Sequence, residues 1–306
     1  MTSGGKHPVA RGLANQIGAI LGGVQFRGKW RVSHVVGGML RLITSEADCY
    51  PIPGARVSIP LNDRIGRLMW TGCYELELVT FLQAMLGPGS TFVDVGCNIG
   101  YFSIIGAALV GESGAVHSFE PDPDCFSRLE ENSRAYAWVR AYHSAVADRV
   151  GEITFYRSNK KTESGWGTVF NDGTPRPRLN VPVCTLDACL ANGQIEKIDV
   201  LKMDVEGGEY RVLLGGRAAL EATRPVIWME ANQSCLSRDD RLVADLLTLL
   251  QEWRYFLLGL EDSVSNSLGT IVAIPQERPQ LIDRVERLPL CLRRVRLLDG
   301  AAGAAD

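Results

Sequence analysis

A strand–helix alternation between residues 91 and 143 constrains the fold of this chain more than any other feature of its sequence. Short apolar runs typical of buried strands alternate there with stretches of helical spacing. The pattern predicts strands at 91–95, 115–119 and 139–143, separated by helices at 101–110 and 122–137. Strands joined by helices in this way form a parallel sheet that helices cover on both faces.

Later segments extend this core. Apolar runs predict four more strands at 198–203, 225–229, 255–260 and 270–274, with helices around 213–220 and at 242–253. A helix is also predicted at 74–86, and residues 11–45 indicate a helical or irregular segment followed by short β elements around 55–61. We therefore predict an α/β fold: a doubly wound, seven-stranded, mostly parallel sheet with an N-terminal accessory segment.

The turn after the first of these strands is the strongest motif. The strand runs through Asp94 into Gly96 and Gly100, and a helix begins directly afterwards. Glycines at such a turn let the backbone approach a ligand closely. A dinucleotide-binding loop would need G-x-G-x-x-G to place a pyrophosphate at the helix N-terminus. Three residues separate the two glycines here, and the preceding acid suits the amino group of a methionine moiety better than a diphosphate.

An acidic residue ends the second strand in the segment Ser118-Phe119-Glu120-Pro121. A carboxylate about 20 residues after a glycine loop accepts hydrogen bonds from ribose hydroxyls in nucleotide-binding folds. Glu120 is therefore the predicted ribose ligand. The alternative is a surface glutamate before a turn proline.

Two later strands also end in acids. Lys202, Asp204 and Glu206 fall on one face if their strand continues that far. Because buried charge is costly unless paired, the lysine meets a carboxylate, the group lines a cleft, or both; a purely structural ion pair is the alternative. Glu230 ends the next strand. All these acids lie at the carboxyl ends of strands, where open α/β sheets bind ligands.

The overall charge excludes some partners. A net charge of −3 without a long Lys/Arg block gives no electrostatic footprint for nucleic acid or an anionic membrane, although local patches stay open. No window approaches 18 charge-free apolar residues, and the N-terminus lacks the apolar block of a signal peptide. We therefore expect a cytoplasmic protein without a membrane span that acts on a small molecule, and a homodimer remains open.

The order and spacing of these motifs resemble the FkbM family of methyltransferases from about Gly72 to Pro275. Asn98 stands where the general class I pattern has a third glycine, and asparagine is usual there in this family. The similar segments are Thr71-Gly72-Cys73-Tyr74-Glu75, the loop from Asp94 to Phe102, Ser144-Ala145-Val146, Thr185-Leu186-Asp187, Leu201 to Glu209, and Ile271 to Pro275.

The resemblance implies a class I S-adenosylmethionine-dependent O-methyltransferase that acts on a hydroxyl of a small molecule, often a sugar or a polyketide natural product. It implies an accessory segment (1–70), an S-adenosylmethionine-binding domain (71–277) and a C-terminal extension (278–306). The cofactor-binding residues that it implies are Tyr74, Glu75, Asp94, Gly96, Asn98, Gly100, Tyr101, Phe102, Glu120, Ser144, Ala145 and Asp204.

Methyl transfer from a sulfonium is an in-line displacement, which needs alignment of the reacting atoms and exclusion of water. Removal of the acceptor proton needs a general base. We predict Asp204 as that base, with Glu206, Glu209 and Glu230 shaping the same cleft and Glu209 contacting substrate. His143 is the rival base, although a lone histidine at a strand end is more often packed or near the adenine.

Two further expectations concern the part of the site that would bind the methyl acceptor. The carboxylates could hold Mg²⁺, but a site without metal is the preferred interpretation, and the four histidines form no HxxxH or HxH pair. Trp166 could stack on a sugar face from a loop that Gly165 and Gly167 hinge. A tryptophan that simply covers the core is an equal alternative.

Two other functions remain open on the same fold. An NAD-binding oxidoreductase is disfavoured by the glycine spacing. A catalytically silent binding module is disfavoured because the glycine loop, the ribose acid and the Asp204 region are all intact.

Overall fold

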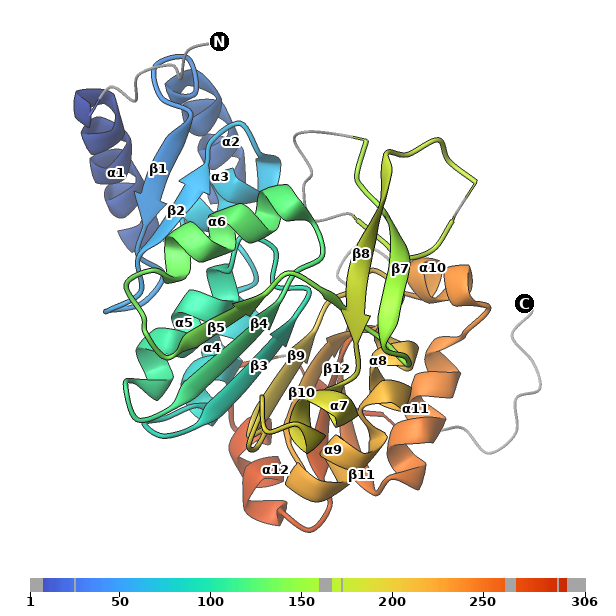
Figure 1. Cartoon of the computed structure of the whole chain (residues 1–306). Coiled ribbons are helices and arrows are strands. Elements are labelled where there is room, and N and C mark those ends of the chain that lie inside the picture. Colours follow the sequence, from blue (N-terminus) through green and yellow to red (C-terminus); the bar gives the residue numbers. More distant parts are fainter. Residues whose placement is uncertain are drawn as a thin grey trace, which may run out of the picture.

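The computed structural model describes residues 8–24, 26–159, 167–171, 173–261, 268–290 and 292–295. A central sheet with the order β13-β11-β12-β10-β9-β3-β4-β5 organises the chain (Figure 1). Its strands are β3 (Thr91–Val95), β4 (Ala115–Phe119), β5 (Val139–Tyr142), β9 (Val200–Met203), β10 (Val226–Glu230), β11 (Tyr255–Glu261), β12 (Leu268–Pro275) and β13 (Leu292–Arg294).

The seven predicted strands are confirmed, and six of them run in one direction. The strands from β5 to β10 pair in parallel, whereas β12 is antiparallel to both of its neighbours, β10 and β11. An eighth strand was not predicted: β13 pairs antiparallel with the outer edge of β11. The sheet is therefore mostly parallel, with its chain order reversing between β3 and β9.

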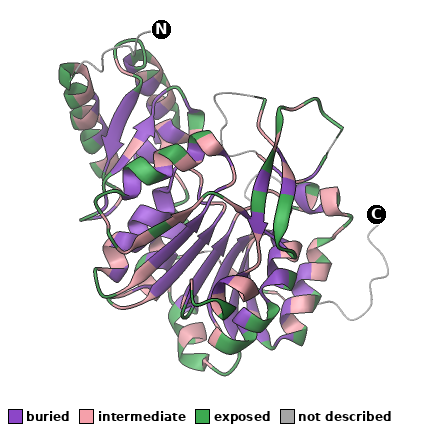
Figure 2. Cartoon of the chain, viewed as in Figure 1, coloured by how far each residue is buried: buried purple, intermediate pink, exposed green. Residues whose placement is uncertain are grey.

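Helices cover both faces of this sheet. One face carries α4 (Leu76–Met85), α5 (Tyr101–Val110) and α12 (Pro279–Glu286), and the other carries α7 (Leu186–Ala191), α8 (Glu209–Gly215), α9 (Arg217–Thr223) and α11 (Val243–Glu252). Phe92 packs on the first face and Val93 on the second, as the alternation of a strand requires. Figure 2 shows the strands in the middle of the sheet as buried, and every residue of β3 and β9 is buried.

Two predicted helices differ from the structure. The helix expected at 122–137 begins as predicted, with Asp122 as its cap, which accepts hydrogen bonds from two backbone N–H groups, but α6 (Pro123–Ser133) ends early. The chain leaves the helix there, and the Tyr136 hydroxyl donates to Gly54 O at 2.7 Å. The helix expected around 213–220 is split at Gly216 into α8 and α9. Gly215 lies so close to the Ala147 carbonyl that a Cβ would approach its oxygen to 2.0 Å.

Two small sheets flank the central one. The N-terminal part forms α1 (Pro8–Gly23), α2 (Lys29–Leu40), the hairpin of β1 (Glu46–Cys49) and β2 (Val57–Pro60), and α3 (Arg64–Trp70). Between β5 and β9 the chain forms a sheet of β6 (Ala145–Val146), β8 (Arg178–Cys184) and β7 (Gly151–Tyr156), which has its own small core. The segment after β10 forms α10 (Gln233–Leu236) and the 3₁₀ turn η1 (Ser237–Asp239).

Within the described residues, none of the helices combines the length and the apolar character that crossing a membrane requires.

Candidate functional site

A cavity of about 1290 Å³ lies at the carboxyl ends of β3, β4, β9 and β10. This edge, beside the point where the strand order reverses, is where open α/β sheets bind ligands. The structure brings most of the predicted residues together there. Those that line the cavity are Tyr74, Glu75, Gly96, Asn98, Tyr101, Phe102, Glu120, Ser144, Ala145, Asp204, Glu206 and Glu230.

The glycine loop is held against two neighbouring strands. The backbone N–H groups of Gly96 and Cys97 both donate to Phe119 O, at 3.0 and 3.1 Å. Gly96 has a φ of 73° and lies so close to the next loop that a Cβ would approach Asp204 O to 1.9 Å. Only glycine satisfies both conditions, so this residue couples the glycine loop to the loop that carries Asp204.

Glu120 is fixed by the backbone on two sides. Its Oε2 accepts from the N–H of Asn98 at 2.7 Å, and its Oε1 accepts from the N–H of Asp122 at 2.8 Å. Burial raises the pKa of Glu120 to about 7, against the opposing effect of these two hydrogen bonds. Each carboxylate oxygen keeps a lone pair for a further donor, and the side chain lines the cavity.

Behind the loop lies a buried polar network. Lys202 Nζ lies 3.1 Å from Asp94 Oδ1 and donates to Gly96 O at 2.8 Å. Asp94 Oδ2 accepts from Ser103 Oγ at 2.7 Å. Although burial opposes the charged ammonium, the carboxylates of Asp94 and Asp204 raise the pKa of Lys202 above its ordinary value. Asp94 is fully buried and does not line the cavity. It therefore affects the site only indirectly, because it pairs with the lysine that binds the glycine loop.

Three aromatic rings form one wall of the cavity. Tyr74 stacks on Phe102 with ring centroids 5.8 Å apart and meets the edge of Tyr101 at the same distance. Tyr101 and Phe102 begin α5 and are themselves buried. The faces of these rings are apolar, and Glu75, which also lines the cavity, hydrogen-bonds with the Tyr74 side chain.

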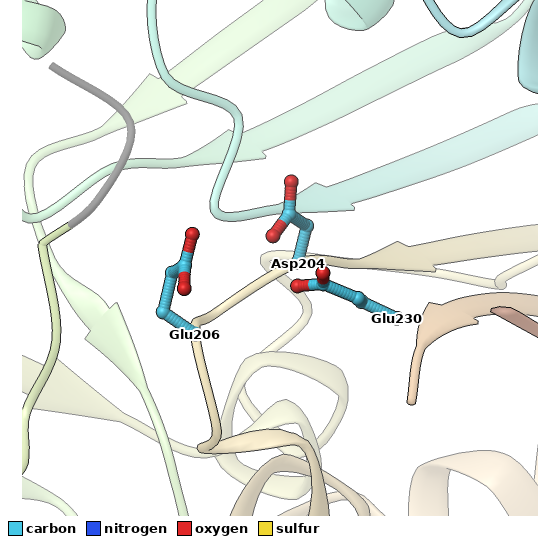
Figure 3. Close-up of side chains that lie close together, drawn as sticks. All are labelled: Asp204, Glu206 and Glu230. Carbon is cyan, nitrogen blue, oxygen red and sulfur yellow. The ribbon is translucent and has the colours of Figure 1, made fainter. Parts of the chain in front are cut away.

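Asp204, Glu206 and Glu230 form the acid cluster of the site (Figure 3). One oxygen from each carboxylate lies within 4.8 Å of the others. Two of the three come from the loop after β9, and Glu230 ends β10, the neighbouring strand. Nearby cations are few: Lys202 Nζ lies 3.9 Å from Asp204 Oδ2, and Arg238 Nη1 lies 3.9 Å from Glu206 Oε2.

Mutual repulsion perturbs the cluster. Burial, followed by the charge of Asp204, raises the pKa of Glu230 to about 10 and that of Glu206 to about 7. Glu230 therefore holds a proton at neutral pH and can donate a hydrogen bond. Oxygen donors of this kind also suit Mg²⁺, so the residues present could hold a divalent cation.

Some predicted site residues lie outside the cavity lining. Glu209 is buried, and its Oε1 accepts from the N–H groups of Val205 and Gly207, so it shapes the loop of the acid cluster. Gly100 packs against Leu129 at the start of α5. Trp166 lies outside the described residues.

His143 is exposed and not among the cavity residues. Its ring stacks on Phe126, with centroids 4.8 Å apart, and its Nε2 lies 3.1 Å from Pro121 O. The structure therefore does not bring this rival base together with the acid cluster.

Sequence reasoning missed several polar residues that line the cavity. Arg238 donates from Nη1 to Glu206 O at 3.1 Å, and the Thr168 hydroxyl donates to the same oxygen at 3.2 Å. Asn232 caps α10 and lies two residues after Glu230, so the strand-end motif pointed toward it. No local signal identifies Arg238 or Thr168, because both reach the site only through the packing of segments distant in sequence.

The sequence matches the model of the methyltransferase FkbM domain over residues 94–257. It is 28% identical over 204 residues to the 2-O-methyltransferase NoeI of Sinorhizobium fredii, covering 61% of this chain and 82% of that protein. It is 34% identical over 154 residues to the hexuronic acid methyltransferase AglP of Haloferax volcanii, covering 50% and 61%. It is 31% identical over 162 residues to the 31-O-demethyl-FK506 methyltransferase FkbM of Streptomyces tacrolimicus, covering 42% and 60%.

Proposed function

Because this chain belongs to the FkbM family of methyltransferases, we propose that it transfers the methyl group of S-adenosylmethionine to a hydroxyl of a small molecule that contains a sugar or polyketide moiety. The observation that carries this proposal is a single cavity in which Glu120, on the donor side, and the acid cluster, on the acceptor side, both face the same space. In this proposal residues 71–277 form the S-adenosylmethionine-binding domain, and Ile65, Met69, Pro289 and Leu290 from the flanking parts 1–70 and 278–306 complete the cavity lining.

The donor side fits S-adenosylmethionine. Among the described residues, the side-chain Oδ1 of Asn98 is buried without a hydrogen-bond partner, although the residue lines the cavity. Together with Glu120 it offers oxygen acceptors at the end of β4, the position at which ribose hydroxyls bind in such folds. Tyr74, Tyr101 and Phe102 provide the apolar wall that excludes water.

The acceptor side supplies proton chemistry. S-adenosylmethionine brings an already activated methyl group, so the protein must orient the acceptor oxygen and remove its proton. Asp204 is the proposed base because its side chain is 34% exposed, against 18% for Glu206, and a substrate hydroxyl can reach it. Glu230 is protonated at neutral pH, so its role is to donate a hydrogen bond to the acceptor.

A hydroxylated acceptor such as a sugar suits this site. The cavity exceeds the roughly 300–1,000 Å³ of an ordinary ligand pocket, which leaves room for an acceptor beside the donor. Glu206, Asn232 and Arg238 surround the acceptor side with hydrogen-bonding groups. The relatives named for a 2-O position and for a hexuronic acid support a carbohydrate acceptor.

The first test is calorimetric titration of the full chain with S-adenosylmethionine, S-adenosylhomocysteine and NAD. We expect saturable binding of the first two and none of NAD. In Glu120→Ala the affinity for both should fall by roughly 10–100-fold, as expected for lost hydrogen bonds to a charged group. Binding of NAD instead would support the oxidoreductase, and a folded protein that binds none of the three would contradict the proposal.

The metal alternative needs its own test. We expect turnover to persist in EDTA, since the proposed chemistry uses only carboxylates and the sulfonium. Activity that disappears with EDTA and returns with Mg²⁺ would instead assign the acid cluster to a cation.

A further inference from the structure

The two N-terminal helices, α1 and α2, and the turns that follow them expose many large apolar residues to solvent. Ten large apolar side chains of this region are between 45% and 85% exposed. We call them the N-terminal apolar face. They are Val9, Leu13, Ile20, Val24, Phe26, Trp30, Val35, Met39, Leu42 and Ile43. Apolar exposure on this scale marks an interaction surface rather than ordinary surface scatter.

The inner face of α1 packs Ala14, Ile17 and Leu21 on the core and is also anchored by polar contacts. Arg11 Nη2 lies 2.5 Å from Asp48 Oδ1, and Asn15 Nδ2 donates to Asp48 Oδ2 at 2.9 Å. Asp48 lies in β1, against which α1 packs. These bonds fix the rotation of the helix about its axis, so Val9, Leu13 and Ile20 are held on its outer side.

In α2 as well, polar groups lie on the inner face, beside Val36 and Leu40, which pack on the core. Lys29 is only 4% exposed and donates from Nζ to Gly22 O at 3.3 Å, and Ser33 Oγ lies 2.6 Å from Thr71 Oγ1. Trp30, Val35 and Met39 point outward as a result. An ordinary surface helix confines its apolar stripe to the inner face, whereas both of these helices carry large apolar residues on their outer faces as well. Figure 1 shows the two helices at one end of the molecule.

This region also carries positive charge without negative charge. Residues 1–45 contain no Asp or Glu, so all 35 acidic residues of the chain follow them. The cations of the same stretch are Lys6, Arg11, Arg27, Lys29, Arg31 and Arg41. Arg27, Arg31 and Arg41 are exposed, and the Arg31 guanidinium lies 5.2 Å from the centroid of the Trp30 ring. The net charge of the whole chain conceals this asymmetry.

We propose that the N-terminal apolar face docks the protein on the surface of an anionic lipid bilayer. Ile20, Val24, Phe26 and Trp30 gather around the turn between α1 and α2 and enter the interfacial layer, while Arg27 and Arg31 meet lipid phosphates. Apolar helix faces with tryptophan and arginine, and without carboxylates, are the pattern that binds such a surface.

Other occupants fit less well. A symmetric contact with a second copy of the chain would bring two cationic faces together, and like charges oppose that contact. A nucleic acid would match the arginines but would leave the exposed valine, isoleucine, leucine and methionine side chains without partners.

The test is cosedimentation of the full chain with vesicles of phosphatidylcholine alone or with roughly one-third phosphatidylglycerol. We expect binding to the anionic vesicles that is at least about tenfold stronger than to the neutral ones and that weakens at about 1 M salt. Trp30→Ser and the double variant Arg27→Gln, Arg31→Gln should each weaken it by about tenfold or more. Leu242→Ser, which changes an apolar side chain 57% exposed outside the face, should bind like the unchanged protein.

Circular dichroism is used to check that each variant is folded. If Trp30→Ser does not fold, vesicle binding by the double arginine variant alone tests the proposal. The proposal is overturned if the unchanged chain ignores anionic vesicles or if both variants bind as well as it does. It is also overturned if size-exclusion chromatography without lipid shows a dimer that these variants dissociate, because a second copy would then cover the face.

Discussion

The carboxylates on the donor side and those of the acid cluster have very different partners. On the donor side, Asp94 meets an ammonium and a hydroxyl, and Glu120 accepts two backbone hydrogen bonds. In the acid cluster, carboxylates face one another within 4.8 Å. Within the part of the chain that the structure describes, cations form ion pairs with only two of these three, and no closer than 3.9 Å.

This difference separates two tasks. A carboxylate with fixed partners holds one geometry, which suits recognition of an unreacting part of a ligand. Carboxylates that repel one another spread their pKa values, so that one keeps a proton while another remains free to accept one. In the proposed function, the same residue type therefore serves binding on one side and proton transfer on the other.

The largest expected effect separates the two tasks directly. Asp204→Asn keeps the shape of the side chain but removes its ability to accept the acceptor proton. We expect turnover to fall by about 10²–10⁴-fold while calorimetry still shows binding of S-adenosylmethionine. Glu112→Gln, at an exposed turn at the opposite edge of the sheet, is the control and should keep full activity. Full turnover in Asp204→Asn would remove Asp204 from the role of base.

The next largest effect is expected at the buried ion pair of Lys202 and Asp94. Lys202→Met leaves Asp94 buried without its cation, so the free energy of unfolding in urea should fall by about 3–5 kcal/mol. Adding Asp94→Asn to the same chain removes the unpaired charge and should restore part of the loss. A change below about 1 kcal/mol in the single variant would show that the buried pair does not hold the glycine loop.

A smaller effect, of opposite sign, is expected in the acid cluster. The folded protein holds the proton of Glu230 up to a pKa of about 10, whereas the unfolded chain releases it near 4.5. Stability is therefore lost as the pH rises through this window. Glu230→Gln cannot ionise, so it should exceed the unchanged protein by about 1–3 kcal/mol at pH 8 and match it below pH 4.5. Equal stability at both values would contradict the raised pKa.

The smallest effect is expected at Glu277, which serves as the matched control for Glu230. Glu277 forms an exposed pair with Arg224, whose guanidinium lowers the pKa of that carboxyl to about 2. The stability from this pair is present above pH 4.5 and is lost as the pH falls toward 2. Glu277→Gln should cost less than about 1 kcal/mol at pH 7, with no change between pH 5 and 9 in the same urea titrations.

Much of the site could be predicted because local sequence carries it. Asp94, Glu120, Asp204 and Glu230 each follow or end an apolar run, and the strands of a parallel sheet share one carboxyl edge. Sequence could not show which acids have partners. The pairing of Asp94 with Lys202 depends on β3 lying beside β9, although 106 residues separate the lysine from the glycine loop it supports.

The errors in the predicted helix ends have a similar cause. Periodicity predicted one helix around 213–220, but Gly215 packs against the carbonyl of Ala147 and the helix divides. Periodicity also extended the helix after Asp122 beyond Ser133, where the chain turns so that Tyr136 can reach Gly54. Both ends were decided by contacts with segments far away in sequence.

By itself, the sequence determined the seven strands, the glycine loop and the acids at the carboxyl edge, because periodicity and glycine spacing are local properties. It also determined that residues 1–45 carry cations without carboxylates. Only the tertiary structure decided which polar groups of α1 and α2 are held inward, through Asp48 and Thr71, and that large apolar residues are left on their outer faces. A helix has two faces, and which of them meets solvent depends on the partners that the rest of the fold provides.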